Sequence, residues 1–341
     1  MIIRYVESLN KALHLLMEDN NKVFVLGEDI LDPYGGAFKV TKGLSTSFPK
    51  RVLSTPISEA SITGFATGLA IRGFRPILEI MFGDFITLCT DQIVNGATKY
   101  HNMYDEKISV PIVIRTPMGG RRGYGPTHSQ TLESLFFGIN GLKIIAPSNY
   151  HNPGDLLYKT VLTTENPTMF IENKLLYSEK LKEPDKNGKV DDFYYSLIKN
   201  SNDIYPSISL ILEKEEQPDV TLITYGGMTN IVLKAAMEVF LEEEILVEII
   251  IPSLIKPLPI NDILPSAKKS GRILIVEEGI KTSGWGAELA SQITENLFIN
   301  LKKPIERIGA KELPIPSSKF LEDKVLPQIK DIEKSLLKIA L

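Results

Sequence analysis

Two acidic side chains stand at the starts or ends of predicted elements, where they are placed to act on a bound ligand. Glu59 follows the segment 54–58 and opens a run with apolar residues at helical spacing, so Ser58 is the predicted N-cap. Glu28 follows the apolar run 22–27, a predicted buried strand. Ligands bind at the carboxyl ends of strands in open α/β sheets. Simpler interpretations are a solvated first-turn carboxylate for Glu59 and a backbone-capping carboxylate for Glu28.

Among the four histidines, His128 has the sequence context most suited to a site. It follows a glycine-rich loop, residues 116–125, and glycine lets the backbone come close to a ligand. Imidazole also changes charge near neutral pH, which suits proton transfer. Phe85 stands in an apolar segment, where packing in the core is the simplest interpretation.

The elements that position these residues alternate along the chain. Strands followed by helices predict a doubly wound α/β domain with a parallel sheet over residues 1–180. The polar segment 181–216 predicts a linker that carries an insertion, and residues 217–341 predict a second, smaller α/β domain. Strands are expected at 22–27, 51–53, 75–82, 110–115, 142–147 and 168–172, and the strand segments of the second domain at 219–227, 246–251, 272–278 and 305–309; helices are expected at 5–19, 59–70 and 85–100.

Composition excludes several classes of protein. The 341 residues carry a net charge of −4, which gives no electrostatic reason to expect nucleic acid or an anionic membrane. No apolar run reaches the roughly 18 residues that a membrane helix needs, and no signal peptide is recognised. The single cysteine, Cys89, excludes an intrachain disulfide and is expected to pack in the core. A cytoplasmic location is therefore expected.

Five motifs, in this order and at these distances, carry a resemblance to a known family. They are Val25–Asp29, Tyr34–Phe38, Gly73–Phe85, Asp91–Asn95 and Gly125–Gln130. With them the chain resembles the β subunit of the E1 component of 2-oxo acid dehydrogenases, thiamine-diphosphate-dependent enzymes of the transketolase-like group. The resemblance implies a pyrimidine-binding domain followed by a transketolase C-terminal-like domain.

The resemblance also assigns roles to single residues. Glu59 matches the carboxyl group that shares a proton with N1′ of the cofactor's aminopyrimidine, and it would need burial to hold that proton. Phe85 matches the aromatic residue on the face of that ring, and Ile57 a contact beside it. His128 matches the active-site histidine near the substrate or the lipoyl group. Glu28 matches a buried acidic position that relays protons.

One motif of the group is absent from the sequence. Relatives hold the diphosphate and Mg²⁺ with a Gly-Asp-Gly run, which this chain lacks. The resemblance therefore implies that a separate α subunit binds the diphosphate and Mg²⁺, in an α2β2 heterotetramer. A potassium site on backbone carbonyls is implied near four positions, with Thr164 where relatives carry an acidic residue: Ile112, Val161, Thr164 and Asn166.

The implied reaction is oxidative decarboxylation of a 2-oxo acid, of pyruvate or branched-chain type, with acyl transfer to a lipoyl group on a partner E2. A related acyl transfer such as acetoin cleavage is the alternative within the family. A non-catalytic β-like scaffold is the alternative outside catalysis, and the intact Glu59, Phe85 and His128 argue against it. Arg121 and Arg122 depart from the small residues of relatives and would meet an anionic substrate, the α chain or water.

Overall fold

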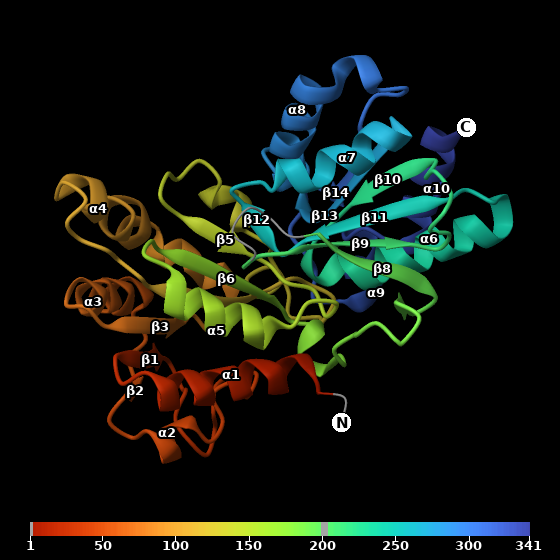
Figure 1. Cartoon of the computed structure of the whole chain (residues 1–341). Coiled ribbons are helices and arrows are strands. Elements are labelled where there is room, and N and C mark those ends of the chain that lie inside the picture. Colours follow the sequence, from red (N-terminus) through yellow and green to blue (C-terminus); the bar gives the residue numbers. More distant parts are fainter. Residues whose placement is uncertain (1–2, 199–203) are drawn as a thin grey trace. The chain divides into compact units, whose positions relative to one another are not determined.

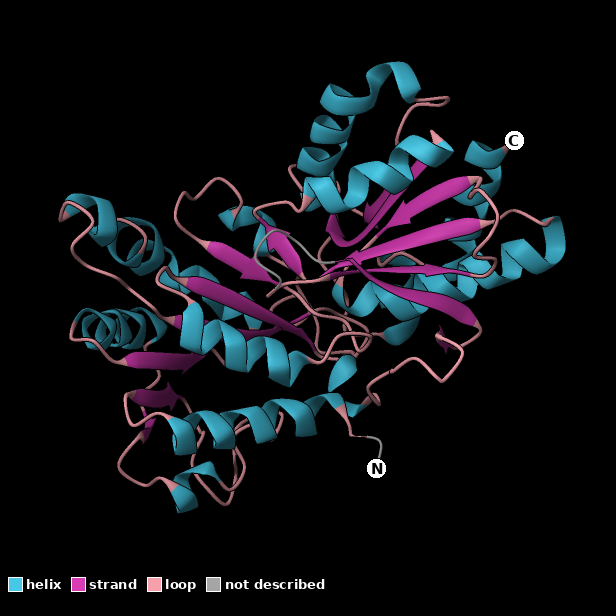
Figure 2. Cartoon of the chain, viewed as in Figure 1, coloured by secondary structure: helices cyan, strands magenta, loops and turns pink. Residues whose placement is uncertain are grey.

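A computed structural model describes residues 3–198 and 204–341, and its contacts divide the chain into two compact units. The first unit comprises the described residues up to Met118, with Leu135–Ile145 and His151–Leu181. The second comprises Gly119–Ser134, Ala146–Tyr150 and the described part of Lys182–Leu341. Each unit contains strands and helices, which Figure 2 distinguishes by colour. None of the described helices is long and apolar enough to cross a membrane.

The strands of the first unit form a parallel sheet, as the alternating pattern predicts. Within this unit their order is β5-β6-β4-β3-β1-β2, so β1 and β3 each have a neighbouring strand on both sides (Figure 1). Residues buried in a parallel strand are mostly apolar on both faces, and β1 shows this pattern. The strands are β1 (Val23–Gly27), β2 (Val52–Ser54), β3 (Arg75–Glu79), β4 (Val113–Met118), β5 (Lys143–Ile145) and β6 (Thr168–Asn173).

Helix α1 (Tyr5–Asp19) has the bounds that its apolar spacing predicts. It buries Leu9, Leu13 and Leu16 and packs against α5 (Pro153–Thr163). Helix α3 (Glu59–Ile71) begins at the predicted residue, with Ser58 as its N-cap. The shorter helices of this part of the chain are α2 (Leu44–Ser47), α4 (Tyr100–Met103), the 3₁₀ helices η1 (Gly83–Cys89), η3 (Glu133–Phe136) and η4 (Leu176–Ser178), and the π-helix η2 (Gln92–Ala97).

The predicted single helix over 85–100 is wrong. The segment divides into the 3₁₀ helix η1, the π-helix η2 and then α4. Local hydroxyl groups favour the tighter turns: Thr87 and Thr90 donate to carbonyls three residues back, at 3.0 and 2.7 Å. In the π-helix, both the N–H and the hydroxyl of Thr98 donate to the carbonyl of Ile93, five residues back. Apolar spacing alone cannot distinguish these helix types.

The second unit has a mixed sheet in the order β14-β13-β10-β11-β9-β8-β7. Strands β10, β11, β13 and β14 are parallel, and β9, β8 and β7 continue the sheet in antiparallel pairing. The strands of this sheet are β7 (Lys189–Val190), β8 (Phe193–Ile198), β9 (Ser207–Ile211), β10 (Val220–Ile223), β11 (Val247–Pro252), β13 (Ile273–Ile280) and β14 (Glu306–Ala310). The short strand β12 (Leu254–Lys256) follows β11 in the chain.

Helices cover both faces of this sheet, as a doubly wound domain requires. Val220 and Leu222 of β10 belong to the core cluster formed with α6 (Thr229–Glu243) and α10 (Ile329–Ala340). Thr221, between them, points to the opposite face and its hydroxyl lies 2.8 Å from that of Ser266 in α7 (Ile260–Ser270). Helix α8 (Trp285–Leu297) packs against α7, and the remaining helices are α9 (Lys319–Val325) and the 3₁₀ helices η5 (Gly226–Met228) and η6 (Phe298–Asn300).

The segment 181–216, predicted as a linker with an insertion, contains strands β7, β8 and β9. β9 pairs antiparallel with β11, so much of this polar segment extends the second sheet. β8 is largely half-buried, with only the consecutive residues Ser196 and Leu197 exposed, and it lies between β9 and β7 in the sheet. Residues 199–203 of the predicted insertion lie outside the described residues.

Candidate functional site

Glu59 is buried at the start of helix α3. Its side chain is 6% exposed, and its carbonyl accepts hydrogen bonds from the Thr63 hydroxyl at 2.7 Å and the Cys89 thiol at 3.6 Å. Ile62 contributes to its buried surroundings, whereas Ile57, also expected to shield it, is 85% exposed. The solvated interpretation of Glu59 therefore does not hold, and Ile57 offers its side chain to solvent in this chain.

Glu28 lies beside Glu59, as the sheet topology requires. It follows β1, whose last carbonyl, that of Gly27, accepts a hydrogen bond from Thr55 just before α3 at 3.1 Å. Burial raises the pKa of Glu28, the charge of Glu59 raises it further, and the backbone N–H of Ser58 opposes the shift. One oxygen of Glu28, Oε1, is buried without a hydrogen-bond partner among the described residues. The two predicted carboxylates thus share one site.

Phe85 is half-buried in η1 and forms part of an aromatic wall. Its ring lies 6.1 Å from that of Phe82 in an edge-to-face arrangement, and Phe82 lies 5.7 Å from Phe38. Phe38 in turn stacks on Tyr177 at 4.8 Å. Packing against neighbouring rings thus accounts for Phe38, Phe82 and the buried side of Phe85. The exposed side of Phe85 could contact a ring such as an aminopyrimidine.

Cys89 is a packing residue, as predicted for a lone cysteine. Its side chain is fully buried and not paired. Burial raises the pKa of the thiol to about 12, with the hydrogen bond to Thr63 opposing it and Glu59 and Glu28 adding to it. The thiolate is therefore disfavoured, and the residue has no nucleophilic role.

His128 lies on the loop 119–134, which belongs to the second unit. The imidazole is half-buried, and its Nδ1 lies 3.0 Å from the Thr127 hydroxyl. Its backbone N–H donates to the carbonyl of Gly125 at 3.3 Å. The structure thus brings Glu28 and Glu59 together in the first unit and places His128 in the second.

The two arginines of this loop have different surroundings. Arg121 donates from Nη2 to the Pro327 carbonyl at 2.5 Å, and its backbone N–H donates to Glu322 at 2.6 Å. These hydrogen bonds hold Arg121 against its own unit, so its side chain does not extend toward a substrate. Arg122 is exposed, with its guanidinium 5.6 Å from the ring centre of Tyr124.

A buried charge cluster in the first unit was not predicted. Arg115 donates to Glu172 at 2.7 and 2.8 Å and to Glu79 at 2.7 Å, and Tyr177 donates to Glu172 at 2.7 Å. Burial disfavours the charged form of Arg115, but Glu172 and Glu79 outweigh it and hold its pKa above its ordinary range. Burial raises the pKa of Glu79. The available signal was a charged residue within each of three otherwise mostly apolar strands: Glu79 in β3, Arg115 in β4 and Glu172 in β6.

The carbonyls implied for a potassium ion are close together and already accept hydrogen bonds. Arg75 Nη1 donates to the carbonyls of Val161 and Thr164, at 2.8 and 2.9 Å. The carbonyl of Asn166 accepts from the hydroxyl of Thr164 at 2.7 Å, and that of Ile112 from the N–H of Thr168 at 2.9 Å. Arg75 therefore already places a positive charge at two of these carbonyls, and the potassium site stays a prediction.

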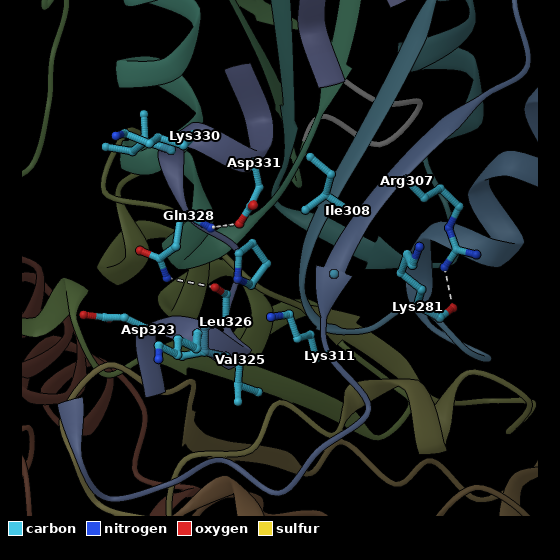
Figure 3. A pocket seen from close by; sticks show the side chains of 14 residues that line it. Lys281, Arg307, Ile308, Lys311, Asp323, Val325, Leu326, Gln328, Lys330 and Asp331 are labelled. Carbon is cyan, nitrogen blue, oxygen red and sulfur yellow. Dashed lines mark hydrogen bonds between the residues drawn. The ribbon is translucent and has the colours of Figure 1, made fainter. Parts of the chain in front are cut away.

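Thiamine diphosphate can be tested against the same residues. The orphaned, buried Glu28 Oε1, the buried Glu59 and the half-buried Phe85 fit a heteroaromatic ring that carries hydrogen-bonding nitrogens. The pyrimidine end of the cofactor therefore fits the first unit. A pocket of about 680 Å³ in the second unit is lined by none of the predicted site residues (Figure 3).

Comparisons with known proteins identify two transketolase domains in this chain. Residues 2–180 match the transketolase pyrimidine binding domain, and residues 210–332 match the transketolase C-terminal domain. The chain is similar over its whole length to a split gene transketolase structure described as an inactive beta4 tetramer, with a TM-score of 0.70 at 20% identity and 99% of that chain covered. This likeness confirms the two-domain α/β fold.

Sequence relatives are more specific. The chain is 37% identical to the mitochondrial pyruvate dehydrogenase E1 component subunit beta-1 of Arabidopsis thaliana, covering 96% of this chain and 87% of the relative. It is 34% identical to the pyruvate dehydrogenase E1 component subunit beta of Rickettsia bellii, covering 99% of both. It is 35% identical to the beta subunit of acetoin:2,6-dichlorophenolindophenol oxidoreductase of Bacillus subtilis, covering 96% and 94%. The chain therefore belongs to the transketolase-like family of E1 component β subunits.

Proposed function

We propose that this chain is the β subunit of a thiamine-diphosphate-dependent 2-oxo acid dehydrogenase E1. The reaction is oxidative decarboxylation of a 2-oxo acid, with acyl transfer to a lipoyl group on an E2 acyltransferase. The observation that carries the proposal is the buried pair Glu28 and Glu59 at the carboxyl ends of neighbouring strands. When bound, the cofactor supplies the carbanion that attacks the keto carbon.

The chain's own residues control a proton in this proposal. Glu59 shares a proton with N1′ of the aminopyrimidine, and burial at 6% exposure keeps water from competing for it. Glu28, whose pKa burial raises, stands next to it and passes protons to and from it. Phe85 orients the ring by packing on its face. His128 serves the substrate or the lipoyl group.

A separate α subunit completes the site in this proposal. The sequence lacks the Gly-Asp-Gly run, so the α subunit holds the diphosphate and Mg²⁺. The surface next to Glu59 supports such a partner, because large apolar side chains there are exposed: Ile57 at 85%, Phe65 at 56% and Leu88 at 56%. A Cβ at Gly68 of α3 would meet nothing within 4 Å, so this helix face is open to close packing. The family resemblance further implies an α2β2 heterotetramer in the cytoplasm, and it is the sole ground for proposing K⁺ at the carbonyls of Val161 and its neighbours.

The substrate remains a choice within one reaction class. Pyruvate and branched-chain 2-oxo acids fit the proposal equally. Acetoin cleavage is the second candidate, since the Bacillus subtilis relative named for acetoin is 35% identical, close to the 37% of the Arabidopsis thaliana protein.

The test compares Glu59→Gln with Glu18→Gln, an exposed glutamate on α1 of the same unit. In the complex assembled with the α subunit, Glu59→Gln should lower the rate of pyruvate decarboxylation by roughly 100-fold or more, since an amide cannot share the proton. Assembly by gel filtration and calorimetric binding of thiamine diphosphate with Mg²⁺ should persist. Full activity of Glu59→Gln would refute the assignment. Tight binding of the cofactor to the β chain alone would refute the split site.

A further inference from the structure

The loop that carries His128 is closed on itself and strained. The N–H of Gly119 donates to the carbonyl of Gln130 at 3.2 Å, which joins the two ends. Four residues near its start have positive φ: Gly119 at 97°, Arg121 at 69°, Gly123 at 69° and Gly125 at 78°. A positive φ at Arg121 costs free energy, so neighbouring contacts must hold this conformation.

Buried carboxylates of the second unit supply those contacts. One oxygen of Glu322 accepts the N–H of Arg121 at 2.6 Å, and the other accepts the N–H of Gly123 at 3.2 Å. Glu278 Oε1 accepts the N–H of Gly120, the residue before Arg121, at 2.8 Å. Glu322 is fully buried, with 0% exposure, which is rare for a glutamate unless its carboxylate is paired.

The approach between the loop and Glu322 is close. A Cβ on Gly120 would lie 2.7 Å from Leu326 Cδ1 and 3.1 Å from Glu322 Oε1. A Cβ on Gly123 would lie 3.1 Å from the carbonyl of Ser317. Glycine at these positions therefore lets the backbone reach the carboxylate, and a shift of Glu322 would be transmitted to the loop.

The segment around Glu322 is itself held. In α9, the N–H of Glu322 donates to Ser318 at 2.8 Å and the N–H of Leu326 donates to Glu322 at 3.0 Å. Beyond it, Gln328 donates from its side chain to the Leu326 carbonyl at 2.8 Å and from its backbone to Asp331 at 2.9 Å (Figure 3). The carboxylate thus sits on a fixed support, as a positioning group requires.

We infer that Glu322 is a positioning residue for His128: its two carboxylate oxygens fix the backbone of residues 121–123 and thereby the place of the imidazole. The inference rests on the proposed role of His128 in the reaction. A carboxylate is suited to this task because both of its oxygens accept hydrogen bonds, whereas an amide has one acceptor and would set N–H groups against the N–H of Gly123.

The first test measures the loop directly. Hydrogen exchange of the peptide 119–130 should be faster in Glu322→Gln than in the native complex. Asp323→Asn is the matched control, since it changes the same charge on the same helix at a side chain that is 38% exposed. Glu322→Asp retains the charge, but its shorter side chain reaches fewer donors, so its exchange rate should lie between those of the native complex and Glu322→Gln. If Glu322→Gln does not fold, Glu322→Asp provides the test. Unchanged exchange in both Glu322 variants would overturn the inference.

The second test is a double-mutant cycle on kcat/KM in the assembled enzyme. Glu322→Gln alone should lower kcat/KM by roughly 10- to 100-fold, because small displacements of a reacting group are costly. In a His128→Ala background it should cause no further loss, since its effect acts through the imidazole. Additive losses would overturn this inference alone. Native kcat/KM in His128→Ala would instead remove the proposed role of His128, and the inference with it.

Discussion

Glu133 is expected to make the stability of this protein depend on pH near neutrality. The carboxyl group is 1% exposed, accepts a hydrogen bond from the Tyr225 hydroxyl, and leaves Oε2 without a partner among the described residues. Its pKa is raised to about 7, because burial, together with the charges of Glu277 and Glu278, outweighs the hydrogen bonds from the Tyr225 hydroxyl and a backbone N–H. At pH 8 the folded protein must therefore hold a buried charge that burial disfavours.

The sign and size follow from linkage. Between the ordinary pKa of 4.5 and the folded value of about 7, the folded state holds a proton that the unfolded state has lost. Stability therefore falls as pH rises through this window and is level above it. The shift corresponds to about 3 kcal/mol in full, of which roughly 2.5 kcal/mol develops between pH 5 and pH 8.

The assay is urea unfolding of the native chain and Glu133→Gln, measured in parallel from pH 5 to pH 8. The glutamine variant cannot ionise, so the difference in unfolding free energy between the two proteins should change by that amount in its favour. Tyr225→Phe removes a donor that stabilises the charged form, so its window should move to higher pH. A difference that stays constant across this range, or that changes in favour of the native chain, would refute the reasoning.

Two further predictions concern the first unit. Arg115→Met should lower the unfolding free energy by about 3–5 kcal/mol, because it leaves Glu79 and Glu172 buried without their cation. The measurement is denaturant unfolding, with Arg72→Met, a substitution of an exposed arginine, as the control. Equal losses in the two variants would contradict a stabilising role of the buried charge cluster. Gly154→Ala should cost about 1–3 kcal/mol, because its Cβ would lie closer than 3.0 Å to Ser8, whereas Gly138→Ala, with nothing within 4 Å, should be nearly neutral in the same measurement.

Periodicity predicted the elements that position the site, because burial on one face leaves a regular mark on the sequence. Helix α1 has its predicted bounds, and α3 begins at Glu59 after its N-cap. Glu28 and Glu59 were each singled out by their places at strand and helix ends, and the structure shows that they interact. The family resemblance was needed to suggest a role for Phe85, because an aromatic residue in an apolar segment is indistinguishable from core.

What could not be predicted depends on contacts between residues far apart in the chain. Arg115 reads as the end of an apolar strand until the register places it beside Glu79. The division of 85–100 depends on hydroxyl groups such as that of Thr98, which compete with the regular helix ladder. The polar residues of 181–216 lie mostly outside the strands β8 and β9, and their number led to the prediction of a linker, although β9 is buried in the sheet.

The loop 119–134 has a consequence for how this protein can be divided. Its residues precede the end of the matched pyrimidine binding domain at residue 180, yet the loop belongs to the compact unit formed by the C-terminal part of the chain. A gene split at the boundary between the two matched domains would encode the loop on one polypeptide, with Glu278 and Glu322 on the other. The domains that the sequence comparison matches and the compact units of the structure therefore have different boundaries in this chain.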